Sequence, residues 1–301
     1  MKSKMLPVAS LILTLVTTSA TAQTAQNSKT QFAETNGKKI AYRAIGKGEP
    51  IILVNRFRGT LDTWDPLFLD KLAENFKVIT FDYTGIGYST GTLPTDVSLV
   101  AEDIKDLADF LKLKKVLVVG WSYGGTVAQV ATLNYPQLIT KTVLIGTGPP
   151  GKNDVPLEKA FLERALKPIN DEEDEIVLFF EPNSEASIKA SKKSHDRIFK
   201  RLDVSKIPST QAVFDLYFKG GMVYREDKEN YRNQLKTTKT PILVISGDHD
   251  ISFAVENWFA LLRELPTTQI IVFPHTGHAP QHQFPELTAK YITDFIGFHD
   301  K

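Results

Sequence analysis

The chain has 301 residues, and its 36 lysines and arginines almost balance its 35 aspartates and glutamates, so the formal net charge is +1. A charge this close to zero argues against binding to nucleic acid or to an anionic membrane surface. The chain has no cysteine, which excludes disulfides, thiolate nucleophiles and cysteine-based metal sites. Its length suits one large α/β domain with an insertion, or two small domains.

The N-terminus has the pattern of a secretory signal peptide over residues 1–22. Two lysines precede an apolar run over 5–16, which is shorter than the roughly 20 residues of a bilayer-spanning helix. Small residues ending at Ala22 form an A-x-A cleavage signal. We expect a secreted or periplasmic protein whose mature chain does not insert into a membrane, with an uncleaved anchor as the alternative. The polar stretch over 23–30 is predicted to be a disordered linker.

Strands and helices alternate through most of the remaining chain. Residues 32–45 are typical of a hairpin, since Asn36-Gly37 is a favoured two-residue turn. Short apolar runs predict further strands at 51–54, 78–81, 116–119, 142–145, 241–246 and 269–273. Helical patterns begin near Asp65-Pro66, Ser98, Thr126, Ala254 and Pro285.

Residues 149–235 differ from the rest, because strand-like runs disappear and amphipathic, aromatic-rich helical patterns dominate. We expect a helical cap there, inserted into a core made of 31–148 and 236–301. The alternation of strands and helices predicts an α/β fold: a mostly parallel, doubly wound sheet with helices on both faces. In such a sheet, functional residues lie beyond the carboxyl ends of the strands.

Ser122 stands in a G-x-S-x-G pattern between a predicted strand and a predicted helix. A serine hydroxyl is a weak nucleophile, so it must be held where a base can reach it. The strand-to-helix turn does this, and Gly120 and Gly124 remove Cβ atoms that would clash there. The pattern is common in loops, so its meaning depends on whether an acid and a histidine follow at suitable places.

Acid and histidine candidates do follow at the carboxyl ends of later strands. Asp248 and Asp250 come directly after the strand at 241–246, and position alone fits either residue. His278 follows the last strand after a short loop and is the favoured base. The other histidines are interpreted as surface, turn or competing residues: His195, His249, His275, His282 and His299. We expect no metal, because no carboxylate cluster accompanies the histidines at 275–282.

Together these motifs resemble the α/β-hydrolase fold superfamily, in particular its capped esterase, lactonase and haloperoxidase-like members. The stretch 120–125 resembles the nucleophile elbow, and 82–89 is similar to a D-x-R-G-x-G-x-S turn with Thr84 in place of arginine. The resemblance of 247–250 to a G-x-x-D motif implies that Asp250 is the acid. The stretch 277–280 looks like the loop of the catalytic histidine, His278.

The loop after the strand at 51–54 departs from the superfamily pattern. Asn55-Arg56 stands where the family usually has His-Gly. The resemblance implies that the backbone N–H groups of Phe57 and Tyr123 form the oxyanion hole. We hypothesise that Arg56 or Arg58 interacts with an acidic substrate group. The alternative is a surface arginine, or one paired with Asp62 or Asp65.

A serine nucleophile implies an acyl-enzyme route, which argues against the carboxylate-based chemistry of haloalkane dehalogenases and epoxide hydrolases. We therefore predict a serine hydrolase that cleaves a small-molecule carboxylic ester or lactone with Ser122, Asp250 and His278, without a cofactor. Haloperoxidase, perhydrolase or aminopeptidase activity on the same fold is one alternative. A catalytically silent ligand-binding protein is another.

Overall fold

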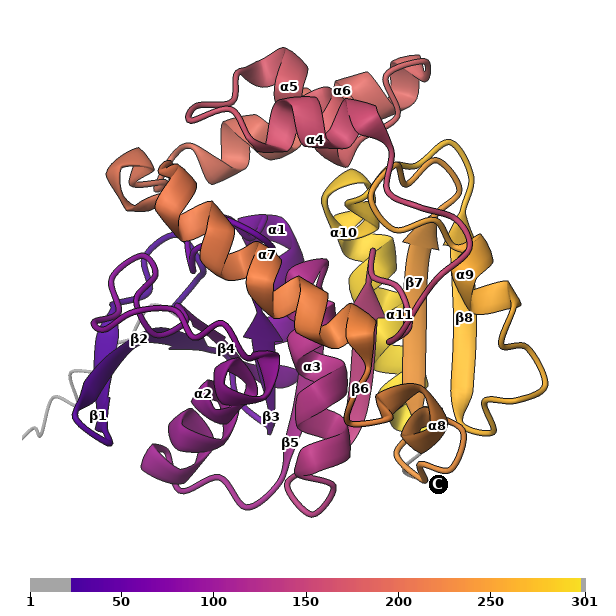
Figure 1. Cartoon of the computed structure of the whole chain (residues 1–301). Helices are drawn as coiled ribbons and strands as arrows, with labels where there is room; N and C mark the ends of the chain where they lie inside the picture. Colours follow the sequence, from indigo (N-terminus) through magenta and orange to yellow (C-terminus); the bar gives the residue numbers. More distant parts are fainter. Residues whose placement is uncertain (1–22, 299–301) are drawn as a thin grey trace, which may run out of the picture.

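The computed structural model describes residues 23–298 (Figure 1). The predicted signal peptide, 1–22, lies outside these described residues, so the structure does not address it. Within 23–298, no helix combines the length and the apolar character needed to cross a bilayer.

An eight-stranded sheet forms the centre of the fold, with strand order β1-β2-β4-β3-β5-β6-β7-β8. Its strands are β1 (Gln31–Thr35), β2 (Lys38–Ile45), β3 (Glu49–Val54), β4 (Phe76–Phe81), β5 (Val116–Trp121), β6 (Ile139–Ile145), β7 (Ile242–Gly247) and β8 (Thr268–Phe273). Only the pairs β1–β2 and β2–β4 are antiparallel; every later pair is parallel. The predicted mostly parallel sheet is therefore confirmed, including the hairpin at its start.

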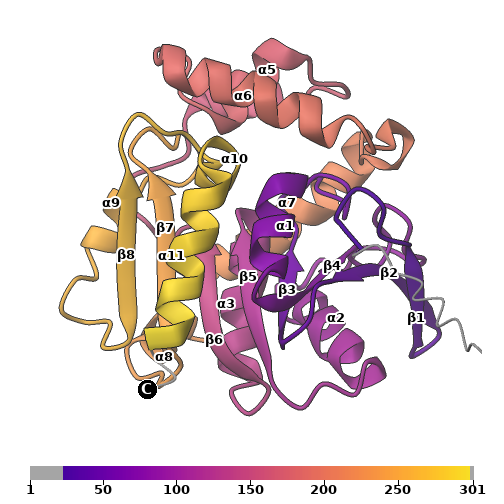
Figure 2. The same cartoon turned by 180° about the vertical axis from the view of Figure 1, so that it is seen from behind.

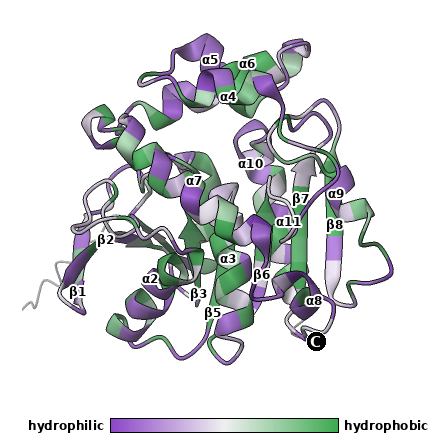
Figure 3. Cartoon of the chain, viewed as in Figure 1, coloured by the Kyte–Doolittle hydropathy of each residue, from purple (hydrophilic) through white to green (hydrophobic). Residues whose placement is uncertain are grey.

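Helices cover both faces of the sheet, as predicted. They are α1 (Pro66–Ala73), α2 (Val97–Phe110), α3 (Tyr123–Asn134), α9 (Glu256–Phe259), α10 (Pro280–Gln283) and α11 (Pro285–Phe298). Figure 1 shows α2 and α3 in front of the sheet, and Figure 2 shows α1 and α11 on the opposite side. Strand β3 sends Ile52 and Val54 into the first layer, and Ile51 and Leu53 into the second. Figure 3 shows the resulting hydrophobic colouring of the central strands.

The aromatic-rich stretch after β6 folds into helices, as its sequence pattern predicts. They are α4 (Lys159–Ala165), α5 (Glu172–Phe179), α6 (Glu185–Ile198), the 3₁₀ turn η1 (Val204–Lys206), α7 (Gln211–Glu226) and α8 (Tyr231–Leu235). Helices α4, α5 and α6 lie beyond the carboxyl ends of the parallel strands (Figure 1). Helix α8 instead contacts α3 at the other end of the sheet, where Tyr231 and Leu235 join the core. We call 149–230 the helical insertion below.

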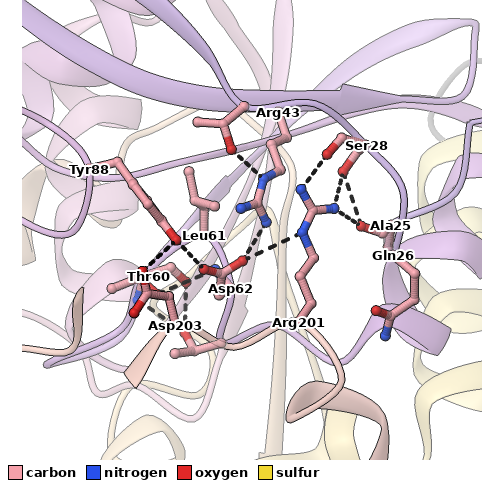
Figure 4. Close-up of polar contacts among 12 residues, drawn as sticks. Ala25, Gln26, Ser28, Arg43, Thr60, Leu61, Asp62, Tyr88, Arg201 and Asp203 are labelled. Atoms are coloured by element: carbon pink, nitrogen blue, oxygen red, sulfur yellow. Dashed lines mark hydrogen bonds and ion pairs between the residues drawn. The ribbon is translucent and has the colours of Figure 1, made fainter. Parts of the chain in front are cut away.

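The segment 23–30 differs from its prediction as a disordered linker, because it is held in place by named contacts (Figure 4). The backbone N–H of Ala25 donates to Asp70 on α1 at 2.7 Å. Arg201, just after α6, donates to the Ser28 hydroxyl at 2.9 Å and also to the carbonyls of Ala25 and Ser28. This stretch is therefore held by hydrogen bonds to α1 and to the residues that follow α6, and it is not merely solvated.

Helix α2 shows a smaller difference, at its start. Its N-cap is Asp96, whose carboxylate accepts a hydrogen bond from the backbone N–H of Ser98 at 2.8 Å. The sequence pattern placed the start of this helix near Ser98, which can also serve as an N-cap. Either side chain can supply the oxygen that an N-cap needs, so composition alone does not separate two candidates that lie two residues apart.

Candidate active site

Ser122 occupies a tight elbow between β5 and α3. Its backbone has φ 59° and ψ −123°, a strained conformation for a residue with a side chain. A Cβ on Gly120 would lie 2.3 Å from the Gly124 carbonyl oxygen, and one on Gly124 would lie 2.0 Å from the Val54 oxygen. Both positions therefore require glycine. The elbow places the serine at the carboxyl end of β5 and at the amino end of α3, where free N–H groups favour negative charge.

His278 and Asp250 are in contact, although 28 positions separate them in the sequence. His278 Nδ1 lies 2.8 Å from Asp250 Oδ2, and both side chains are buried. The other oxygen of Asp250 accepts from the backbone N–H groups of Ser252 and Phe253 at 2.8 and 2.9 Å. These donors fix the carboxylate. A proton held on Nδ1 by Asp250 leaves Nε2 of His278 as the basic nitrogen.

The Nε2 atom of His278 is buried and has no hydrogen-bond partner in the described part of the chain. The structure thus shows no hydrogen bond from the Ser122 hydroxyl to this nitrogen. Such bonds are often long in structures without substrate and tighten when substrate binds. Ser122 itself is only 3% exposed, so the region above it is closed by side chains.

Two residues that the sequence patterns did not single out hold the histidine loop against the elbow. The Trp121 indole N–H donates to the His278 carbonyl oxygen at 2.9 Å. Gly146 has φ +51°, and a Cβ there would lie 3.0 Å from His278 Nδ1 and 3.3 Å from Asp250 Oδ2. Two features of the sequence could have indicated them: Trp121 directly precedes Ser122, and Gly146 directly follows β6. The His278 ring stacks against Phe179 and Phe253.

The two backbone N–H groups that the sequence suggested for an oxyanion hole come from different elements: Phe57 lies in the loop after β3, and Tyr123 is the first residue of α3. Neither Phe57 nor Tyr123 donates its N–H to a protein acceptor within residues 23–298. Asn55 stabilises this loop, since its side chain donates to Phe81 O and accepts from the Trp64 indole, each at 2.6 Å. Asn55 thus provides side-chain hydrogen bonds where the family pattern has histidine.

The two arginines of this loop have different surroundings. Arg58 is saturated: its guanidinium donates to the carbonyls of Ala165, Lys167, Pro168 and Pro208 and to the Asn170 side chain. Arg56 makes one hydrogen bond, from Nη1 to the Phe57 carbonyl at 2.7 Å. Neither arginine pairs with Asp62 or Asp65, so that alternative is wrong: Asp62 pairs with Arg43 and Asp65 with Arg197.

The remaining histidine and acid candidates point to separate partners. Asp248 contacts His249 at 2.6 Å, and His249 stacks on His275. His282 accepts from the backbone N–H of Asp65 at 3.4 Å. Among the described residues, no group of three or more histidine, aspartate or glutamate side chains is arranged to hold a metal ion. The histidines at 275–282 therefore do not form a cluster.

Comparisons with known proteins support the fold described above. A family model described as alpha/beta hydrolase fold matches residues 49–285. A pimeloyl-[acyl-carrier protein] methyl ester esterase of Nitrosomonas europaea is 25% identical over 262 residues, covering 82% of this chain and 95% of the relative. An uncharacterized Mycobacterium bovis protein is 26% identical, covering 88% and 80% of the two chains.

Among solved structures, an alpha/beta hydrolase fold protein from Chitinophaga pinensis superposes with a TM-score of 0.80. It is 26% identical, and the match covers 91% of this chain and 99% of that one. The strand order, the elbow at Ser122 and the match over most of the chain define one class of protein. This chain belongs to the alpha/beta hydrolase fold family, and esterases are among its relatives.

Proposed function

We propose that this protein is a serine hydrolase that cleaves a small-molecule carboxylic ester or lactone through an acyl-enzyme. The observation that carries the proposal is the buried contact between His278 Nδ1 and Asp250 Oδ2, which leaves Nε2 unpartnered at the strand ends that also hold Ser122. A base oriented in this way suits acyl transfer from a serine. Relatives whose names describe ester cleavage support the choice of substrate class.

In the proposed reaction, the Ser122 hydroxyl attacks the substrate carbonyl carbon while His278 Nε2 takes the hydroxyl proton. The tetrahedral oxyanion accepts hydrogen bonds from the N–H groups of Phe57 and Tyr123, each worth roughly 3 kcal/mol in the transition state. Asp250 stabilises the imidazolium and keeps its orientation. His278 then protonates the departing alkoxide oxygen, and the acyl-enzyme forms.

Hydrolysis of the acyl-enzyme completes the cycle, with water as the nucleophile and the Ser122 oxygen as the leaving group. His278 Nε2 removes a proton from the water as its oxygen attacks the acyl carbon. The Ser122 oxygen leaves and regains its proton from His278, which releases the acid. We propose that the helical insertion acts as a cap. Its aromatic rings would then contact the substrate and exclude bulk water from the acyl-enzyme.

A fluorophosphonate probe tests the nucleophile directly. The folded wild-type protein should be labelled at Ser122, and Ser122→Ala should lose labelling and about 10⁶-fold in kcat on an aryl ester. The exposed Ser209 provides a matched control, because Ser209→Ala should retain both. A loss of only a few-fold in Ser122→Ala would remove the nucleophile assignment. Absence of labelling in the folded wild type would favour a ligand-binding protein instead.

A further inference from the structure

Arg56 stands apart from the other enclosed arginines of the molecule. Arg43, Arg197 and Arg201 lie close to carboxylates, and Arg58 is saturated by carbonyl and amide oxygens. Arg56 has no carboxylate within ion-pair distance in residues 23–298, its Nε is buried without a partner, and its single hydrogen bond uses Nη1. A guanidinium is a donor in five directions, so an enclosed one with a single acceptor is left largely unsatisfied.

Aromatic rings hold this guanidinium in place. Its central carbon lies 4.6 Å from the centre of the Phe179 ring and 5.3 Å from that of Trp121. Cation–π contacts of this kind attract and orient a cation, but they do not supply acceptors for its N–H groups. Arg56 is therefore positioned firmly while most of its hydrogen-bonding capacity stays free.

The free side of Arg56 borders a cavity between the core and helices α5 and α6. This cavity is lined by Arg56, Trp121, Phe179, His282, Glu175 and residues of α6. Glu175 is the single acidic residue among those lining it, and its carboxylate is bonded to His195 at 2.8 Å. The cavity thus presents a cation beside apolar rings, and Glu175 acts on this cation only from beyond ion-pair distance.

The protonation states of Arg56 and His282, which both line the cavity, favour the binding of an anion there. Burial, with the charge of Arg58 as the next cause, lowers the pKa of Arg56 to about 10, so the guanidinium stays charged at neutral pH. Burial also lowers the pKa of His282 to about 4, so that ring is neutral. Since His282 Nε2 accepts the Asp65 N–H, its proton is on Nδ1, which is a second donor.

The cavity adjoins the candidate catalytic groups. The Trp121 ring that contacts Arg56 also lies 6.0 Å from the His278 ring and directly precedes Ser122 in the chain. Phe179 stacks on His278 at 6.4 Å while its ring also contacts Arg56. Arg56 immediately precedes Phe57, the proposed oxyanion donor. Arg56 and His278 thus lie against the same two rings, those of Trp121 and Phe179, which places the guanidinium next to the candidate catalytic groups.

We propose that Arg56 binds an ionised carboxylate of the substrate, so that the preferred ester or lactone carries a second acid group distant from the bond that is cleaved. This inference rests on the proposed hydrolase function. The carboxylate supplies the acceptors that Arg56 lacks in the protein, and arginine matches its two oxygens with parallel donors.

The test compares paired substrates. For 4-nitrophenyl hydrogen adipate and the neutral 4-nitrophenyl heptanoate, which match in chain length, the ratio of kcat/KM values measures the carboxylate preference. Wild type should favour the adipate ester. Arg56→Met should lower the ratio by about 10- to 100-fold, because a charge-assisted hydrogen-bond pair is lost. Arg56→Lys, which keeps the charge, should fall between them, and Arg58→Met should leave the ratio unchanged.

An equal loss of kcat/KM on both esters in Arg56→Met, or no loss on either, would overturn the proposal. Calorimetry with free adipate separates the site from the catalysis. Folded Ser122→Ala should bind adipate, and Ser122→Ala combined with Arg56→Met should not. If no ester is cleaved and no probe labels Ser122, but adipate binding still depends on Arg56, the hydrolase proposal fails while the carboxylate site stands. Equal adipate affinity in both proteins removes the site.

Discussion

The two long helices of the insertion are attached to the core by opposite kinds of contact. Helix α6 uses polar bonds: Ser194 and Arg197 both donate to Asp65, at 2.6–3.1 Å. Helix α7 uses rings: Tyr217 packs edge-on against Phe57 and Tyr123, at 5.1 and 4.9 Å. Directional hydrogen bonds specify one placement of a helix, whereas apolar rings tolerate repacking. The α6 side therefore specifies the placement of the insertion more strictly than the α7 side does.

The largest loss of stability is expected when the hydrogen bonds and the ion pair between α6 and Asp65 are removed. Asp65 is fully buried, accepts from α6 and also caps α1. Asp65→Ala leaves the Arg197 charge without its partner, so the free energy of unfolding should fall by about 3–5 kcal/mol. Urea denaturation measures this. Asp196→Ala, on the exposed side of α6, is the control and should stay within about 0.5 kcal/mol. A small loss in Asp65→Ala would show that α6 is held by other contacts.

Acidic pH should lower the stability of the protein by protonating His282, which lies beside Asp65. The pKa of His282 is about 4 in the folded protein, chiefly because of burial, and 6.5 is its ordinary value. Between these values the unfolded state binds more protons, so stability is lost as the pH falls from about 6.5 to about 4. The expected loss is about 3 kcal/mol. Denaturation at several pH values measures it, and His282→Gln should flatten this part of the profile. An unchanged profile would contradict the assignment.

A conservative change on the α7 side should have a smaller effect. Phe214 packs edge-on against Phe57 at 5.4 Å and lies under the Arg58 guanidinium at 4.8 Å. Phe214→Leu keeps the site apolar, so the neighbouring rings can adjust, and the expected loss is about 1 kcal/mol. Melting curves test this. A loss as large as that of Asp65→Ala would mean that α7 is as strictly specified as α6.

The smallest effect is expected from the hydroxyl of Tyr217. This hydroxyl is buried and makes no hydrogen bond of good geometry within residues 23–298, although the backbone N–H of Arg58 lies in weak contact with it. Tyr217→Phe therefore removes an unsatisfied polar atom, and stability should be unchanged or rise by up to about 1 kcal/mol. Ser194→Ala is the comparison on the α6 side and should be destabilising by about 1 kcal/mol or more, because its bond to Asp65 is lost. Destabilisation by Tyr217→Phe would mean that a hydrogen bond to this hydroxyl, such as one from the Arg58 N–H, stabilises the fold.

The centre of the sheet was predictable because its strands are buried there on both faces. Runs such as 51–54 and 116–119 are apolar at successive positions, which distinguishes them from the amphipathic helices. The chain order of serine, acid and histidine was also readable, since each follows a strand at its carboxyl end. The choice of Asp250 over Asp248 came from family resemblance. The structure brings Asp250 into contact with His278 and places Asp248 on His249 instead.

The surroundings of the site were not predictable, because they depend on segments that are distant in sequence. Arg56 and Arg58 are neighbours in the same loop, yet the carbonyls that saturate Arg58 come from residues 165–208. Nothing in a local pattern indicates which arginine finds acceptors. The order of 23–30 likewise depends on Asp70 and Arg201. Helix α8 shares its helical composition with the insertion, although it packs on α3 of the core.

Trp121 is a natural fluorophore next to the candidate site, since its ring contacts Arg56, Phe179 and His278. The chain has three tryptophans, and the Trp121 and Trp64 rings lie 5.7 Å apart. Indoles this close interact electronically, so their near-ultraviolet circular dichroism depends on their relative orientation. The Arg56 cation lies over the Trp121 ring, and its field shifts the emission of that ring. A carboxylate that binds Arg56 changes the net charge beside this ring, so we expect its binding to be measurable by fluorescence, without a label and without turnover.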